Sequence, residues 1–298
     1  MMTRADKLHP EWPTLALLIA CYGTWAATLF WVPWSVVAVA ILIPVIALQA
    51  SLQHEVIHGH PFANRRLSEA LVMASLNLAV PFLRFRDTHL AHHTDETLTD
   101  PYDDPETNYL DPVRWSNLPP VCRAVLQVNN TLLGRILIGP LLGQASFIAS
   151  EARLIRAGNR DVLRAWGWHV LTSVPVVALI IASPTSLGHY LFASYGALSV
   201  LKIRTFLEHQ AHISAPGRTV VVEDRGLLAF LFLNNNFHAV HHMHPGVPWY
   251  RLPKLYVANR SAYLSSNDGY RYASYRQIFR HYLLRAKDPV AHPLYPQK

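Results

Sequence analysis

The chain alternates long apolar stretches with segments rich in arginine and histidine. Each long stretch holds roughly twenty residues, the length that crosses a bilayer as a helix. They cover residues 13–32, 34–52, 162–182 and 187–207. Short turns join the first to the second and the third to the fourth. We therefore expect an all-α integral membrane protein with four transmembrane helices in two hairpins.

Other apolar segments are too short or too interrupted to span. Residues 70–83 and 227–233 are short, and residues 132–149 are broken by Arg135 and a Gly-Pro pair. We expect these at the membrane interface or re-entering it. The tail over 275–287 has an amphipathic helical pattern. It fits a helix on the membrane surface or one packed on the protein, and the sequence leaves both open.

Charge supports the membrane prediction. The chain is 51% hydrophobic and 15% charged, with a net charge of +7, whereas soluble domains are about 25% charged. Residues 54–160 hold ten Arg, residues 208–298 hold eleven Lys plus Arg, and the leader holds Arg4 and Lys7. The turns inside both hairpins hold no Lys or Arg. By the positive-inside rule both termini and the middle segment face the cytoplasm, so the basic excess predicts topology and no nucleic-acid binding.

Histidines are numerous and grouped. Twelve of the seventeen fall within 54–60, 89–93, 209–212 and 238–244, whereas the chain has two cysteines. Three boxes follow from the spacing, and residues at i, i+3 and i+4 share one helical face. The boxes are HxxxH at His54 and His58, HxxHH at His89, His92 and His93, and HxxHH at His238, His241 and His242.

His209, just after the fourth apolar stretch, makes nine imidazoles. A zinc site uses three or four protein ligands, so nine imidazoles imply two metal ions. Imidazole suits zinc, copper, iron and nickel, and the donor type alone does not choose among them.

This arrangement resembles the membrane fatty acid desaturase and hydroxylase superfamily. The order of the boxes, the segment from Asn234 to Pro253, Asp100-Pro101 and Glu208-His209 carry the resemblance. It implies a single desaturase-like domain over residues 1–298, with a cytosolic histidine-rich cap that holds two iron ions. The implied iron ligands are His54, His58, His89, His92, His93, His209, His238, His241 and His242.

Asp100, Glu208 and Asn234 are candidates for orienting ligand imidazoles from outside the metal shell. Each is also a plausible cap or turn residue. His60, His212 and His244 lie near the boxes but off their spacing, which favours supporting or structural roles.

The resemblance implies oxidation of an unactivated C–H bond of a lipid by O2. Fatty acyl desaturation is the first interpretation. Hydroxylation or ketolation of an alkane, lipid or carotenoid stays open, as does decarboxylation of a fatty acid to a terminal alkene. The chain has no room for a redox module, so electrons would come from an external donor of the ferredoxin, rubredoxin or cytochrome b5 type.

Two interpretations belong to other classes. His54–His58 also reads HExxH, the zinc metalloprotease motif in which the glutamate is the general base. That interpretation leaves both HxxHH boxes unexplained. A membrane protein that only stores or senses metal is the other alternative.

Overall fold

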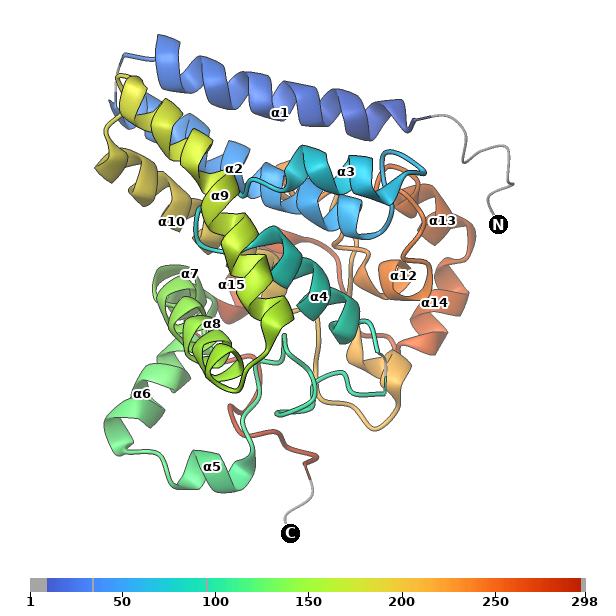
Figure 1. The fold of residues 1–298 in the computed structure, drawn as a ribbon. Helices are drawn as coiled ribbons and strands as arrows, with labels where there is room; N and C mark the ends of the chain where they lie inside the picture. The colour runs from blue at the N-terminus through green and yellow to red at the C-terminus, as the bar shows by residue number, and fades with distance from the viewer. Residues whose placement is uncertain (1–9, 34, 95, 296–298) are drawn as a thin grey trace. The chain divides into compact units, whose positions relative to one another are not determined.

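The computed structural model describes residues 10–33, 35–94 and 96–295, so Arg4 and Lys7 of the leader lie outside the described residues. The described chain is mainly helical (Figure 1). It forms two compact units. Unit 1 comprises Met1–Arg86 and Leu141–Val200, and unit 2 comprises Asp87–Pro140 and Leu201–Lys298.

Unit 1 contains the long apolar helices. Its elements are α1 (Trp12–Trp31), α2 (Ser35–Ile57), α3 (Arg65–Val72), the start of α4 (Phe82–His92), most of α8 (Gly139–Arg156), α9 (Arg160–Ala182) and most of α10 (Leu187–Thr205). Helices α1 and α2 lie side by side (Figure 1). Trp25 Nε1 donates to Tyr190 Oη at 3.1 Å, and Tyr190 Oη donates to the Leu76 carbonyl at 2.7 Å. These bonds tie α1 and α10 to the segment after α3.

Three of these helices, α1, α2 and α9, are long and apolar enough to cross a membrane. Their bounds lie close to those of the first three predicted stretches. The fourth stretch is also helical, as α10, but Lys202 and Arg204 lie in its last turn. Among the described residues α10 does not reach the apolarity of a span. Three of the four expected spans are therefore helices that could cross a membrane, and the prediction of four spans in two hairpins stays a prediction.

Unit 2 consists of short helices and loops. Its helices are α5 (Pro112–Ser116), α6 (Pro120–Asn129), α7 (Leu132–Leu137), α11 (Leu227–Leu231), α12 (His238–Met243), α13 (Leu252–Ala258), α14 (Arg260–Ser266) and α15 (Tyr275–Tyr282), with a 3-10 turn at Ala215–Arg218. Strands β1 (Val221–Val222) and β2 (Arg271–Tyr272) pair in parallel, Val221 opposite Arg271. A core that includes Val240, Leu252 and Tyr256 packs α12 against α13.

The predicted apolar segment 132–149 is two helices, α7 and α8. A Cβ at Gly134 would lie 1.9 Å from the Val128 carbonyl oxygen, so the turn between α6 and α7 requires glycine there. The 227–233 segment contains the short helix α11.

The predicted tail helix is shorter than expected and ends at Tyr282. Tyr275 and Ile278 on its apolar face are buried. This agrees with a helix packed on the protein. The chain after it, residues 283–295, forms a C-terminal strap. In this strap Ala286 bridges to Thr131 and Ala291 bridges to Leu110.

Candidate metal centre

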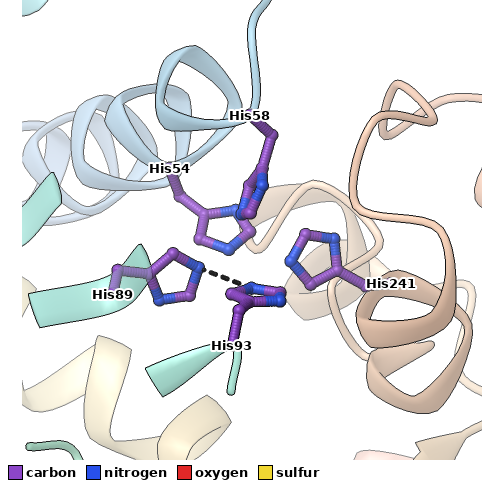
Figure 2. Close-up of side chains that lie close together, drawn as sticks. All are labelled: His54, His58, His89, His93 and His241. Atoms are coloured by element: carbon purple, nitrogen blue, oxygen red, sulfur yellow. Dashed lines mark hydrogen bonds between the residues drawn. The ribbon is translucent and has the colours of Figure 1, made fainter. Parts of the chain in front are cut away.

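The first histidine box lies at the end of α2, in unit 1. His54 is in the last turn of the helix, and His58 follows Ile57, where α2 ends. Their ring centroids are 4.8 Å apart, and both side chains project from the same end of the helix (Figure 2). The HxxxH spacing therefore places two imidazoles side by side, as predicted from helical geometry.

The second box supplies part of a three-histidine group in unit 2, formed by His89, His93 and His241. His89 lies on α4, His93 directly after it and His241 on α12. The Nε2 atoms of His89 and His93 are 3.0 Å apart, and the rings of His93 and His241 are 5.0 Å apart (Figure 2). Their ligand nitrogens all lie within 4.8 Å of one another.

The remaining ligand candidates form a four-histidine group, also within unit 2. Its members are His92, His209, His238 and His242, whose ligand nitrogens lie within 4.8 Å of one another. The His242 ring stacks on His93 at 4.2 Å, so the two groups adjoin. Seven of the nine predicted ligands thus converge within unit 2, where they form two neighbouring sets of donors.

The four-histidine group fits a metal ion better than it fits hydrogen bonding. His209 Nε2 lies 2.8 Å from His92 Nε2 and 3.1 Å from His238 Nε2. An imidazole nitrogen carries one hydrogen or one lone pair, so it can bond to only one of these neighbours. Two nitrogens bound about 2.1 Å from one ion, at a right angle, lie about 3.0 Å apart. A cation can accept all three lone pairs, which resolves the crowding.

Side chains that are not ligand candidates fix the ring orientations of histidines in both groups. Asp104 Oδ1 lies 2.7 Å from His92 Nδ1, Glu106 Oε1 lies 3.1 Å from His89 Nδ1, and Asn235 Oδ1 lies 3.0 Å from His238 Nδ1. Each partner holds the outer nitrogen, so Nε2 of each ring turns toward the group. Carboxylate and amide partners of this kind set the tautomer of a metal-binding histidine and raise its basicity.

The electrostatics of unit 2 favour cation binding. Burial, together with His92 and His242, lowers the pKa of His209 well below its usual value. At His92 burial acts in the same direction, but Glu106 and Asp104 outweigh it and raise the pKa to about 9. Burial would raise the pKa of Glu106, yet His92 and His89 hold it well below its usual range. A lowered pKa keeps the His209 ring nitrogen available as a ligand, and a lowered pKa keeps Glu106 negatively charged beside His92 and His89. Both shifts favour a metal cation, because its ligands must be deprotonated.

The C-terminal strap holds the backbone of His209. The buried Lys287 ammonium donates to the His209 carbonyl and pairs with Asp288 at 3.2 Å. Tyr109 Oη donates to Asp288 Oδ2 at 2.6 Å and accepts from the Ala211 N–H at 2.9 Å. His209 lies outside any regular helix. Its backbone is therefore held in position by these contacts, whereas α4 and α12 position histidines of the second and third boxes.

The three predicted supporting residues differ in what they contact. Glu208 pairs with Arg204 at 2.9 Å and accepts from Asn235 Nδ2 at 3.4 Å, so it acts on His238 through Asn235. Asp100 caps a turn, accepting from the N–H groups of Tyr102 and Asp103. Asn234 has φ of 55° and donates to the Trp249 carbonyl. For Asp100 and Asn234 the turn interpretation describes the contacts.

Asp104, Glu106 and Asn235 were not singled out from the sequence. Asp104 and Glu106 lie in a loop, where no helical spacing connects them to the second box. Asn235 is three residues before His238, and the sequence favoured its neighbour Asn234 instead. An acid within about fifteen residues of a box was the only available signal, and Asp100 matched it equally well.

The histidines off the box spacing have partners elsewhere. His60 pairs with Glu11 at 2.7 Å. His212 contacts Ser214 and lies 3.4 Å from Asp268. His244 packs edge-on against Tyr263. Their contacts agree with structural roles.

Comparison with known proteins identifies the family. A search of curated protein sequences finds no significant match to the chain. The family model described as fatty acid desaturase matches residues 31–274, which include all nine ligand candidates. The match covers well over half of the chain and agrees with its apolar helices and clustered histidines. The chain belongs to the fatty acid desaturase family.

Proposed function

We propose that the chain is an O2-dependent oxidoreductase that holds two iron ions and oxidises an unactivated C–H bond of a lipid, with fatty acyl desaturation as its reaction. The observation that carries the proposal is the four-histidine group. Its converging nitrogens fit a cation and do not form a consistent hydrogen-bond network. Family membership supports iron and a lipid substrate.

The nine histidines are the proposed iron ligands. His92, His209, His238 and His242 would hold one ion. His89, His93 and His241 would contribute to the other, and His54 and His58 supply two further imidazoles. Asp104, Glu106 and Asn235 keep ligand lone pairs directed inward, and Glu208 supports Asn235. Bound iron would supply the oxidising chemistry, with O2 and electrons from an external carrier of the ferredoxin, rubredoxin or cytochrome b5 type.

The rest of the chain serves the site as one desaturase-like domain. The apolar helices hold the protein in the bilayer, where its substrate dissolves. Four crossings would return the chain to the same side each time. The basic segments support a cytoplasmic location for both termini and the histidines.

Metal analysis and product analysis test the proposal together. The full chain, purified in detergent after growth with iron, is expected to contain two iron ions per chain. Incubated with a donor system and lipid, it is expected to give a product two mass units lighter than the substrate. A protein with a single zinc and no iron would contradict the proposal.

A second reaction of the same superfamily remains a candidate. Hydroxylation or ketolation uses the same ligand set, and the three-residue gap between His54 and His58 is typical of alkane hydroxylases and carotenoid ketolases as well as of acyl-lipid desaturases. Hydroxylation adds sixteen mass units to the product. Mass spectrometry of recovered lipid separates it from desaturation.

The HExxH interpretation predicts a different response to mutation. In a zinc protease Glu55 is the base, so Glu55→Gln would abolish activity. In a di-iron enzyme the same substitution is milder than His54→Ala. The seven histidines gathered in unit 2 would have no role in the protease.

A further inference from the structure

A cleft of about 750 Å³ opens in unit 2. Its lining includes Arg225, Phe230, Tyr250, Lys254 and Val257. These residues come from the loop after β1, from α11, from the segment that leads into α13, and from α13 itself. The ligand histidines are absent from the lining, so the cleft is separate from the metal centre.

Two cations in the cleft have no acidic partner among the described residues. Arg225 and Lys254 are exposed, and neither forms an ion pair with a residue that the structure describes. Nearby Arg260 and Arg271 both pair with Glu223, at 2.6 and 2.5 Å. The local acid is therefore already shared by two other cations, which leaves the cleft with a net positive charge.

The acid next to Arg225 in sequence is also engaged. Asp224 Oδ1 accepts from the Gly226 N–H at 2.7 Å, and its Oδ2 accepts from the Tyr275 N–H at 2.9 Å. Both oxygens bond to backbone groups, so this carboxylate caps two segments of chain. An anion that enters the cleft meets two cationic side chains.

Apart from Asn234, the other residues that line the cleft are aromatic or apolar, and more such side chains lie beside it. The Phe230 ring lies 6.1 Å from Trp249, and Trp249 lies 5.8 Å from Tyr250. Phe230 is 44% exposed, Val257 67%, and Leu227, two residues after Arg225, 80%. Aromatic rings beside cations and exposed aliphatic side chains are typical of protein surfaces at the membrane interface.

We propose that this cleft binds the headgroup of an anionic phospholipid of the surrounding membrane. Arg225 and Lys254 contact the phosphate, since guanidinium and ammonium groups are the usual partners of phosphate oxygens. Phe230, Tyr250 and Val257 contact the glycerol and the first carbons of the acyl chains. A concave site with an apolar rim suits one amphiphile better than the surface of an acidic protein. The proposal needs the chain to lie in a membrane and does not depend on the reaction it catalyses.

Lipid retention measures this binding directly. The full chain is equilibrated in detergent micelles that contain equal amounts of dioleoyl phosphatidylglycerol and dioleoyl phosphatidylcholine. It is then re-isolated, and its bound lipids are quantified by mass spectrometry. The wild type is expected to retain phosphatidylglycerol in excess. Arg225→Ala with Lys254→Ala should lower that excess by roughly tenfold, because each basic residue contributes to attraction of anionic lipid.

Two further variants control for charge and for folding. Arg153→Ala with Arg156→Ala removes the same charge from exposed positions of α8 and is expected to leave the excess unchanged. Arg225→Lys with Lys254→Arg keeps both charges and is expected to preserve most of it. An equal loss in the α8 variant would show attraction by net charge alone and would overturn the proposal.

The competing ligands give separate results. Inorganic phosphate in tenfold excess is expected to leave phosphatidylglycerol bound, because it lacks the apolar part; displacement would identify free phosphate as the ligand. A cleft variant that retains its lipid excess but loses donor-driven turnover would identify an acidic protein partner, and the lipid proposal would be wrong. None of the lipid measurements needs iron or turnover, so they stand apart from the test of the proposed function.

Discussion

Units 1 and 2 differ in which side chains they expose and which they bury. In unit 1, large aliphatic side chains face outward: Val174 and Ile181 of α9 are 60% and 70% exposed. In unit 2, charged side chains are buried: Asp104 is 3% exposed and Arg135 5%. Exposed apolar surface of this extent is stable when lipid is the solvent. Buried charge is stable only when it is paired.

The difference shows what each unit is built to do. The exposed apolar surface of unit 1 is suited to the bilayer, and many different apolar residues could supply it. Buried charges of unit 2 have specific partners, as with Asp104 at His92 and Arg135 at the Asn129 carbonyl, 3.0 Å away. Substitutions of buried charges in unit 2 should therefore alter metal binding at single positions, whereas substitutions of exposed aliphatic residues in unit 1 should act through membrane insertion.

The largest effect is expected for a ligand of the four-histidine group. His238→Ala removes a metal ligand of this group, so bound iron should fall from the proposed two ions to at most one per chain. Activity should fall by more than about 100-fold, beyond the loss typical of an outer partner. Metal analysis and lipid mass spectrometry measure both. His212→Ala is the control and should keep both properties; two irons in His238→Ala would rule out this ligand assignment.

A charge on the outer face of unit 1 should block insertion. Val174→Arg places a guanidinium within α9, at a cost of about 3 kcal/mol on insertion scales. The membrane-bound fraction of the protein should fall, as measured by fractionation and immunoblotting. Ile213→Arg changes an aliphatic residue of unit 2 that is even more exposed, at 87%, and this variant should insert normally. Equal insertion of both variants would contradict the contrast between the units.

Removal of an outer partner should have an intermediate effect. Asp104→Ala frees the His92 ring and should weaken metal affinity by about 10–100-fold. Competition with a chelator measures this affinity. Asp100→Ala is the matched control, because Asp100 caps a turn, and it should hold metal as the wild type does. If the two variants lost metal equally, the assignment of Asp104 to His92 would have no support.

The smallest effect concerns pH and the ion-pair hub at Glu223. Hydrogen bonds from Arg260 and Tyr256 outweigh burial and lower the pKa of Glu223 from 4.5 to about 2. The stabilisation of the folded state by ionised Glu223 is therefore complete above pH 4.5 and is lost as the pH falls toward 2. Because these side chains reach solvent, Glu223→Gln should cost about 1 kcal/mol at neutral pH.

Thermal unfolding in detergent between pH 2 and 7 measures this dependence. The wild type should lose stability across the acid window, and Glu223→Gln should lose less there. Asp161→Asn, which breaks the exposed pair with Arg164, should leave the slope unchanged. A Glu223→Gln slope equal to that of the wild type would show that another group governs the acid response.

Much of the structure follows from local pattern. Apolar stretches of span length fix α1, α2 and α9, because a helix in lipid must satisfy its own backbone and remain apolar. Helical spacing likewise brings His89 and His93 onto one face. The fourth stretch also forms a helix, α10, but Lys202 and Arg204 in its last turn lower its apolarity below that of the other three.

The sequence alone determined the family, the apolar helices and the nine candidate ligands, since each depends on residue type and on spacing within one helix. Tertiary structure decided which histidines share a group and which side chains orient them. It chose Asp104 over Asp100 and Asn235 over Asn234, and it brought Lys287 to His209 across 78 positions of the chain. No spacing in the sequence predicts contacts between loops that are distant along the chain, because these contacts form only when the surrounding helices have packed.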